Sequence, residues 1–195
     1  MDRTALAPEI DGGGGVRQEA APRRLSDARL VRGARKGSAD AREEIVRRYW
    51  SEAERTATLI VRDPHAAQDI AQEALLLVLD SLGRFDERKR LGPWLNRIVV
   101  NRSIDWIRKR SDVTVDASHQ PAAPAPSVTD PDLLDALHRL ALPDRVAVVM
   151  RAVLGYRAVE IAEVLGEPAG TTRSRIHRAL QQLRGDLSER EEMDL

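Results

Sequence analysis

Apolar residues recur every three or four positions along most of this chain, and no segment alternates with the two-residue period of a strand. Helix-start signals divide the pattern. Ser26 and Ser38 can each cap a helix, and Asp63 followed by Pro64 is a strong start because the acidic side chain caps and the proline opens the first turn. The segments bounded in this way are about 26–36, 38–61, 63–82 and 93–110. The pattern predicts an all-α fold.

The helical pattern stops at residues 111–131, where proline, alanine and small polar residues predominate. We expect this segment to be a flexible linker between two small helical domains, 25–110 and 132–187. Residues 1–24 are rich in glycine, alanine and proline, so we expect a disordered tail. Residues 188–195 are expected to form an acidic tail.

A helix-turn-helix is predicted at residues 158–184, because Gly166 can end a first helix and Pro168 can open a second. The second helix has an inward stripe of Ala169, Thr172, Ile176, Ala179, Leu180 and Leu183. Its opposite face carries Arg173, Ser174, His177 and Arg178, and no carboxylate occurs between Pro168 and Arg184. Such a face suits the major groove of DNA. The alternative is an ordinary amphipathic hairpin whose arginines only face water.

Residues 84–110 combine nine basic residues with three acidic ones, and they hold Phe85, Trp94 and Trp106. Basic side chains interleaved with aromatic ones suit single-stranded DNA, whose phosphates need positive charge and whose unstacked bases need flat partners. The alternative is that the tryptophans are core residues with arginines around them. For Trp94, which precedes several apolar residues, we expect partial burial rather than base stacking.

A third candidate surface lies in the segment that starts at Asp63. Its inward stripe is Ile70, Ala71, Ala74, Leu77, Val78 and Leu82, whereas Asp69, Gln72, Glu73 and Leu76 share another face. A leucine within an acidic and amide patch indicates a docking surface for a basic protein helix. A solvated helix face is the alternative.

Composition and charge narrow the function further. Lysine plus arginine and aspartate plus glutamate number 31 each, so the net charge is zero and any nucleic-acid binding must come from local segregation of charge. The absence of cysteine excludes disulfides and cysteine-ligated zinc. No apolar run is long enough to span a bilayer, so we expect a cytoplasmic protein without stable membrane insertion.

We expect no metal, no cofactor and no enzymatic activity. The four histidines lie in different segments, at His65, His119, His138 and His177. No nucleophile and base pair stands out in the sequence either.

Taken in order, three motifs resemble an alternative sigma factor of bacterial RNA polymerase, in the extracytoplasmic-function group of the sigma-70 superfamily. They are DPHAAQDIAQEALLLVLDSLGRF, WLNRIVVNRSIDWIRKR and ALPDRVAVVMRAVLGYRAVEIAEVLGEPAGTTRSRIHRAL. The resemblance implies a first domain that docks on core polymerase and opens the promoter −10 element, and a second that reads the −35 element. It also implies an anti-sigma partner that clamps the two domains.

The resemblance assigns residues by position. The polymerase-docking residues are Asp69, Gln72, Glu73 and Leu76. The residues for the −10 element are Arg88, Lys89, Arg90 and Trp94, in and after the loop 86–92, and Asn101, Arg102, Asp105 and Arg108 on the following helix. The residues for the −35 element are Arg173, Ser174, Arg175, His177 and Arg178. Among these, Arg173 and Arg178 are favoured for base edges and the others for phosphates.

Two positions depart from the family pattern. Thr172 stands where an aliphatic core residue is usual, and residues 156–159 replace the usual hydroxyl-capped helix start. Both predict a less stable or differently seated −35 domain. Two other functions stay open: a helix-turn-helix regulator that acts without polymerase, and a helical interaction protein without a DNA role.

Overall fold

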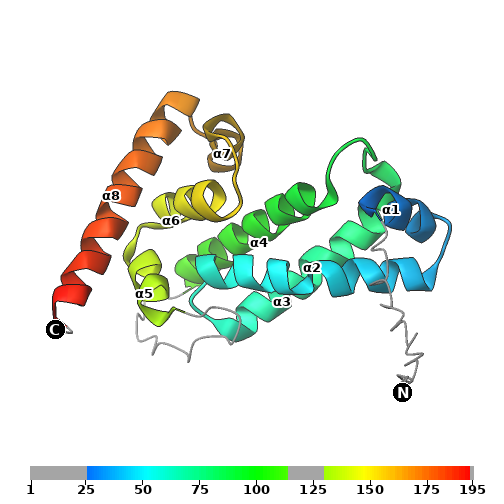
Figure 1. Cartoon of the computed structure of the whole chain (residues 1–195), viewed down its shortest axis with the longest axis horizontal. Coiled ribbons are helices and arrows are strands. Elements are labelled where there is room, and N and C mark those ends of the chain that lie inside the picture. The colour runs from blue at the N-terminus through cyan, green and yellow to red at the C-terminus, as the bar shows by residue number, and fades with distance from the viewer. Residues whose placement is uncertain (1–25, 114–129, 194–195) are drawn as a thin grey trace, which may run out of the picture.

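The computed structural model describes residues 26–113 and 130–193. In sequence order the helices of the first half are α1 (Asp27–Arg35), α2 (Ala39–Ile60), α3 (Pro64–Ser81), the 3-10 turn η1 (Leu82–Arg84) and α4 (Leu91–Val113). Those of the second half are α5 (Pro131–Arg139), α6 (Leu142–Val148), the π-helical turn η2 (Val149–Val153), α7 (Ala158–Leu165) and α8 (Ala169–Met193). No strand occurs in these ranges, which confirms the all-α prediction (Figure 1).

Two predicted boundaries move. Helix α4 continues to Val113, three residues into the predicted linker, and α8 continues to Met193, so most of the segment predicted as an acidic tail is helical. The predicted N-terminal tail, residues 114–129 of the predicted linker and His119 lie outside the described residues, and α5 begins at the last residue of that linker, Pro131.

Helix α2 is the centre of the first half and packs against α1, α3 and α4. Alanines at Ala53, Ala57, Ala71 and Ala74 are fully buried between these helices. Small side chains at facing positions let the helix backbones approach closely, while leucine, isoleucine and valine fill the remaining space. This core therefore needs almost no aromatic side chains.

The inward stripe of α3 differs from the prediction at one leucine. Leu77 was expected in the core but is 37% exposed, whereas Leu75 is 2% exposed. The buried stripe is centred on Ala71, Leu75 and Val78, which are spaced by four and three residues. Leu77 therefore lies at the edge of the stripe and adds to the exposed surface.

Side-chain caps explain two of the three predicted helix starts. The Ser38 hydroxyl accepts a hydrogen bond from the amide of Ala41 at 3.2 Å, and the Asp63 carboxylate accepts from two amides at the start of α3. Ser26 precedes α1 as predicted, but its hydroxyl caps no amide. Instead, Asp27 in the first turn of α1 accepts hydrogen bonds from Arg48 and Tyr49 of α2, which ties the start of α1 to its neighbour.

In the second half, α8 packs against α6 and α7 and completes the predicted helix-turn-helix. Gly166 ends α7 with a φ of 69°, in the left-handed region that glycine adopts without strain. Thr172 is fully buried, and its hydroxyl donates to the Glu167 carboxylate at 2.9 Å. The polar residue at this core position is therefore satisfied. At the start of α7, Arg157 offers no side-chain cap, but the Glu160 carboxylate accepts from the Arg157 amide at 2.8 Å.

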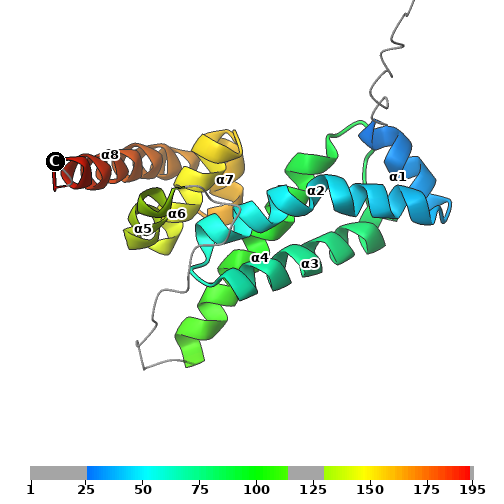
Figure 2. The same ribbon diagram turned by 60° about the horizontal axis from the view of Figure 1, so that its bottom comes forward.

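The two halves contact each other through α2, α5 and α6 (Figures 1 and 2). Arg145 of α6 donates to the carbonyl of Ile60 at the end of α2 at 2.5 Å, and also to carbonyls around the end of α5. Burial lowers the pKa of Arg145 to about 10. A second contact pairs Arg97 of α4 with Glu163 of α7 at 2.9 Å. These polar contacts lie beside one continuous cluster of buried apolar residues to which both halves contribute.

Candidate nucleic-acid and protein interfaces

The outer face of α8 is exposed as the sequence predicts. Arg173, Ser174, His177 and Arg178 are all exposed, while Ile176 and Ala179 between them are buried. Neither Arg173 nor Arg178 makes a hydrogen bond or ion pair with another described residue. Their guanidinium groups are therefore available to an outside acceptor on a rigid helix.

Arg175, predicted as a phosphate contact, differs from its neighbours because its guanidinium is engaged inside the protein. Its side chain is 20% exposed, and its guanidinium donates to Glu167 at 2.8 Å and to Asp144 of α6 at 2.6 Å. These hydrogen bonds lower the pKa of Glu167 and raise that of Arg175. The donors of Arg175 are thus used inside the protein, because its position on α8 turns it toward the helix-turn-helix turn rather than outward.

Two further arginines, which the sequence pattern does not indicate, lie near this face. A groove of about 380 Å³ between η2, α7 and α8 is lined by Arg151, Arg157 and Arg173, together with Ala158 and Ile176. Arg151 and Arg157 belong to different elements from Arg173, so helical periodicity in one segment gives no sign of their proximity. The basic surface is therefore wider than the outer face of α8.

The loop before α4 has an internal framework. The Asp86 carboxylate accepts from the amide and the guanidinium of Arg88, and these hydrogen bonds lower the pKa of Asp86 to about 2. Lys89 and Arg90 are exposed and pair with no described side chain through an ion pair. One basic side chain of the loop is therefore engaged, and two project outward.

Of the aromatic residues in this region, Phe85 is buried and the two tryptophans are half-buried. The ring of Phe85 lies 4.9 Å from that of Trp94 at a tilt of 31°, and Trp94 itself is half-buried against the core. Trp106 is half-buried too, with Arg110 over its ring at 5.0 Å. Of the other α4 candidates, Asn101, Asp105 and Arg108 are exposed and Arg102 is half-buried.

The third surface lies on α3. Asp69, Gln72, Glu73 and Leu76 are all exposed, and Leu76 has 54% of its surface accessible. Leu77 extends this apolar area. An exposed leucine pair beside two carboxylates is a surface suited to a partner that is both apolar and basic.

Sequence comparison identifies the two halves. Residues 45–113 match the family model of sigma-70 region 2, and residues 131–183 match that of sigma-70 region 4. The RNA polymerase sigma factor CarQ of Myxococcus xanthus is 35% identical over 165 residues, covering 80% of this chain and 95% of its own length. The chain belongs to the sigma-70 family. The extracytoplasmic-function sigma factor SigW of Bacillus subtilis is 30% identical, with coverage of 80% and 94%.

Solved structures show the same fold. The sigma factor RpoE of Bartonella quintana, determined in complex with the anti-sigma factor NepR, superposes with a TM-score of 0.63. Its sequence identity is 22%, and the match covers 75% of this chain and 96% of that one. The chain is thus a sigma factor of the extracytoplasmic-function group, which directs RNA polymerase to initiate transcription. A regulator acting without polymerase is not favoured, because region 2 is present beside the helix-turn-helix.

No helix in the described ranges is long and apolar enough to cross a membrane. Nor do three potential metal-ligating side chains cluster anywhere in that part of the chain.

Proposed function

We propose that this sigma factor uses three separate surfaces: α3 for core polymerase, the loop before α4 with α4 itself for the −10 element, and α8 for the −35 element. The observation that carries the proposal is the selective exposure of the candidate residues. On α3, and on α8 apart from Arg175, they are exposed, while apolar residues such as Leu75 and Ile176 on the inner sides of these helices are buried. Binding energy is then available to partners without disturbing either core.

The α3 surface combines attraction with apolar contact. Asp69 and Glu73 would steer a basic element of polymerase, while Leu76 and Leu77 would lose water on contact. Gln72 lies between the two carboxylates and can donate and accept hydrogen bonds.

The −10 surface would capture DNA strands rather than read an intact duplex. Lys89 and Arg90 project from the loop toward solvent and suit phosphates. Trp94, seated on Phe85, offers its remaining exposed surface to an unstacked base. Further along α4, the exposed side chains Asn101, Asp105 and Arg108, together with half-buried Arg102, would face the edge of the remaining duplex.

The −35 surface would read duplex DNA from the major groove. Arg173 and Arg178 project from one face of α8 and can each bind a guanine edge through two hydrogen bonds. Ser174 and His177 would contribute smaller polar contacts. Arg175 would act indirectly by fixing α8 against α6.

We also propose that an anti-sigma factor controls this protein. We further propose that the sigma factor acts in the cytoplasm, together with its polymerase, and that it catalyses no covalent step. The contact between the halves supports the first point. In this conformation Tyr156 donates to the carbonyl of Pro93, beside Trp94, so the second half lies against part of the −10 surface. A partner that favours this closed conformation would hide a DNA-binding surface.

The decisive experiment combines the protein with core polymerase on a promoter that the complex selects. Permanganate-reactive thymines near −10 and a run-off transcript should appear only when both components are present. Trp94→Ala should reduce opening more than duplex binding, provided that circular dichroism shows a folded protein. Reversal of Asp69 and Glu73 to lysine should abolish polymerase association without unfolding, since both are exposed. Tight promoter binding by the wild-type mixture without melting would overturn the proposal.

A further inference from the structure

One arginine of α1, Arg35, makes most of the contacts between α1 and the connection from α3 into α4. Arg35 donates through Nε to the carbonyl of Leu82 at 2.8 Å and through Nη1 to the carboxylate of Glu87 at 2.5 Å. Its third nitrogen, Nη2, donates to the carbonyl of Phe85. One guanidinium thus binds three residues within a six-residue stretch, and 47 to 52 positions separate it from them.

The three acceptors of Arg35 lie at the two ends of η1 and in the loop before α4. Leu82 begins the 3-10 turn η1, and its carbonyl also accepts the hydrogen bond from the Phe85 amide at 3.1 Å that closes this turn. Phe85 directly follows the turn, so Arg35 binds at both of its ends. Phe85 also supports Trp94, and Glu87 lies inside the loop that carries Lys89 and Arg90. Arg35 therefore fixes both the base of the loop and the aromatic pair beside it.

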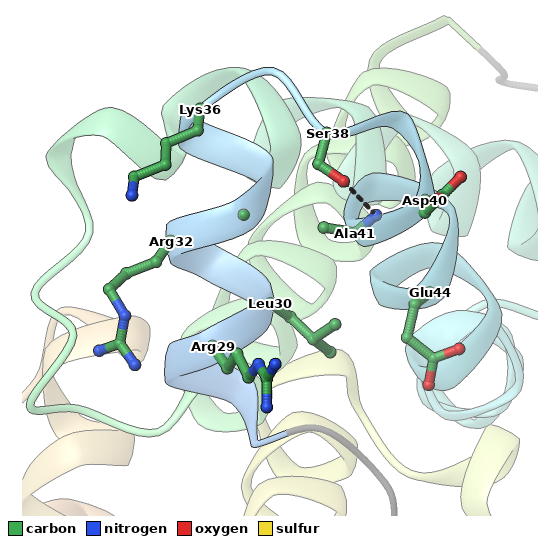
Figure 3. A pocket seen from close by; sticks show the side chains of 9 residues that line it. Arg29, Leu30, Arg32, Lys36, Ser38, Asp40, Ala41 and Glu44 are labelled. Carbon is green, nitrogen blue, oxygen red and sulfur yellow. Dashed lines mark hydrogen bonds between the residues drawn. The ribbon is translucent and has the colours of Figure 1, made fainter. Parts of the chain in front are cut away.

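No other described residue of α1 provides the same support. Arg32 makes one contact to Glu87 at 3.2 Å, and its side chain is 57% exposed, twice the 28% of Arg35. Arg29, Arg32 and Lys36 line a groove of about 710 Å³ between α1 and α2, with Asp40 and Glu44 on the far side (Figure 3). Arg29 makes no ion pair with a described residue, which makes it a matched control for the loss of one α1 arginine.

We propose that Arg35 is a positioning residue for −10 recognition: it holds the loop 86–90 and the Phe85–Trp94 pair in the geometry that captures an unpaired promoter base. The inference rests on the proposed function of that loop. Helix α1, which has no DNA-contacting residue in that proposal, thereby becomes part of promoter opening. The planar guanidinium suits the task because its donors diverge to three acceptors at once, which an ammonium group on a flexible stem cannot reproduce.

The test uses the full chain with core polymerase and fork-junction DNA that carries each of the four bases at the captured −10 position. Wild type should prefer one base. Arg35→Ala should reduce that preference and the yield of open complex by between about tenfold and a hundredfold, the range expected when a binding group is displaced by about an ångström. Arg35→Lys should recover only part of the loss, and Arg29→Ala should behave as wild type.

Three results separate the possible explanations. If Arg35→Ala lowers thermal stability but keeps the wild-type base preference, its role is structural and the inference is wrong. Should Arg35→Ala fail to fold, Glu87→Gln provides the second test, since it removes the charge paired with Nη1 while leaving both backbone acceptors. Unchanged preference in folded Glu87→Gln and Arg35→Lys would also overturn the inference. If wild type shows no base preference, and Trp94→Ala and Lys89→Ala have no effect on opening, the proposed function of the loop is what fails.

Discussion

The −35 surface on α8 and the −10 surface before α4 hold their basic side chains in position in different ways. Each combines basic side chains that project outward with others that are engaged inside the protein. On α8, Arg173 and Arg178 project from a continuous helix, and Arg175 pairs with Glu167 and Asp144. In the loop, Lys89 and Arg90 project, but the support comes from Arg35 on a distant helix.

The difference follows from the backbone. A helix satisfies its own hydrogen bonds, so the direction of each side chain on α8 is fixed by its position in the sequence. A short loop has no regular series of backbone hydrogen bonds, so its conformation depends on hydrogen bonds from side chains and neighbouring elements. We therefore expect the −35 surface to tolerate changes outside its own helix pair better than the −10 surface does.

The largest expected effect comes from removing the internal brace of the −35 surface. Arg175→Ala leaves Glu167 and Asp144 without their shared partner, and it should lower the free energy of unfolding by about 2 to 3 kcal/mol. Urea denaturation of the full chain measures this. Arg173→Ala, two residues away on the exposed face, is the control and should change stability by less than about 0.5 kcal/mol. Equal losses in the two variants would contradict the distinction between bracing and projecting arginines.

The projecting arginines should affect selectivity instead. Arg173→Ala or Arg178→Ala should each cost about 1 to 3 kcal/mol of discrimination between cognate and scrambled −35 duplexes, because a bidentate contact to a guanine edge is lost. Titrations of holoenzyme on both duplexes measure this. Replacement of a residue that touches only phosphate should weaken both duplexes alike. If wild type binds the two duplexes equally, the assignment of these arginines is wrong.

A smaller effect is expected at the boundary between the two halves, where His138 of α5 is partly buried. Burial, with Arg145 and Arg62 nearby, lowers its pKa from 6.5 to about 4, while Asp135 acts in the opposite sense. The unfolded chain then binds the proton more readily, so the stabilisation is complete above about pH 6.5 and is lost as the pH falls toward 4. Between pH 7 and 5.5, His138 should account for about 1 kcal/mol of lost stability.

This pH effect is measured by comparing urea denaturation of wild type and His138→Gln at both pH values. His65→Gln is the control, because His65 is exposed. If the stability of His138→Gln falls by as much as that of wild type, the loss comes from carboxylates elsewhere.

The smallest effect on stability and on promoter opening is expected from a change inside the loop before α4. The pair between Arg88 and Asp86 is short at 3.0 Å, yet the Arg88 side chain is 90% exposed. Water and salt screen such a pair, so Arg88→Ala should leave the unfolding midpoint unchanged. It should also reduce opening far less than Arg35→Ala does. A loss as large as that of Arg35→Ala would mean that the loop is stabilised from within, and the contrast with α8 would disappear.

The sequence by itself determined the helices, the helix-turn-helix and the exposed faces of α3 and α8. These features depend on the spacing of residues within one segment, because the spacing along a helix fixes the face to which each side chain points. The same logic located Gly166, whose positive φ ends α7, and the buried position of Thr172.

Only the tertiary structure decided which charged side chains are engaged, because an ion pair depends on what lies opposite a residue in space. Arg175 shares a helix with Arg173 and Arg178, and only the position of Asp144 on α6 distinguishes it. Arg35 lies 52 residues from Glu87, beyond the reach of any periodic pattern. Leu77 lies at the edge of the apolar stripe of α3, so its spacing alone allowed it to be buried or exposed. The packing of α2 against α3 decided that it is exposed.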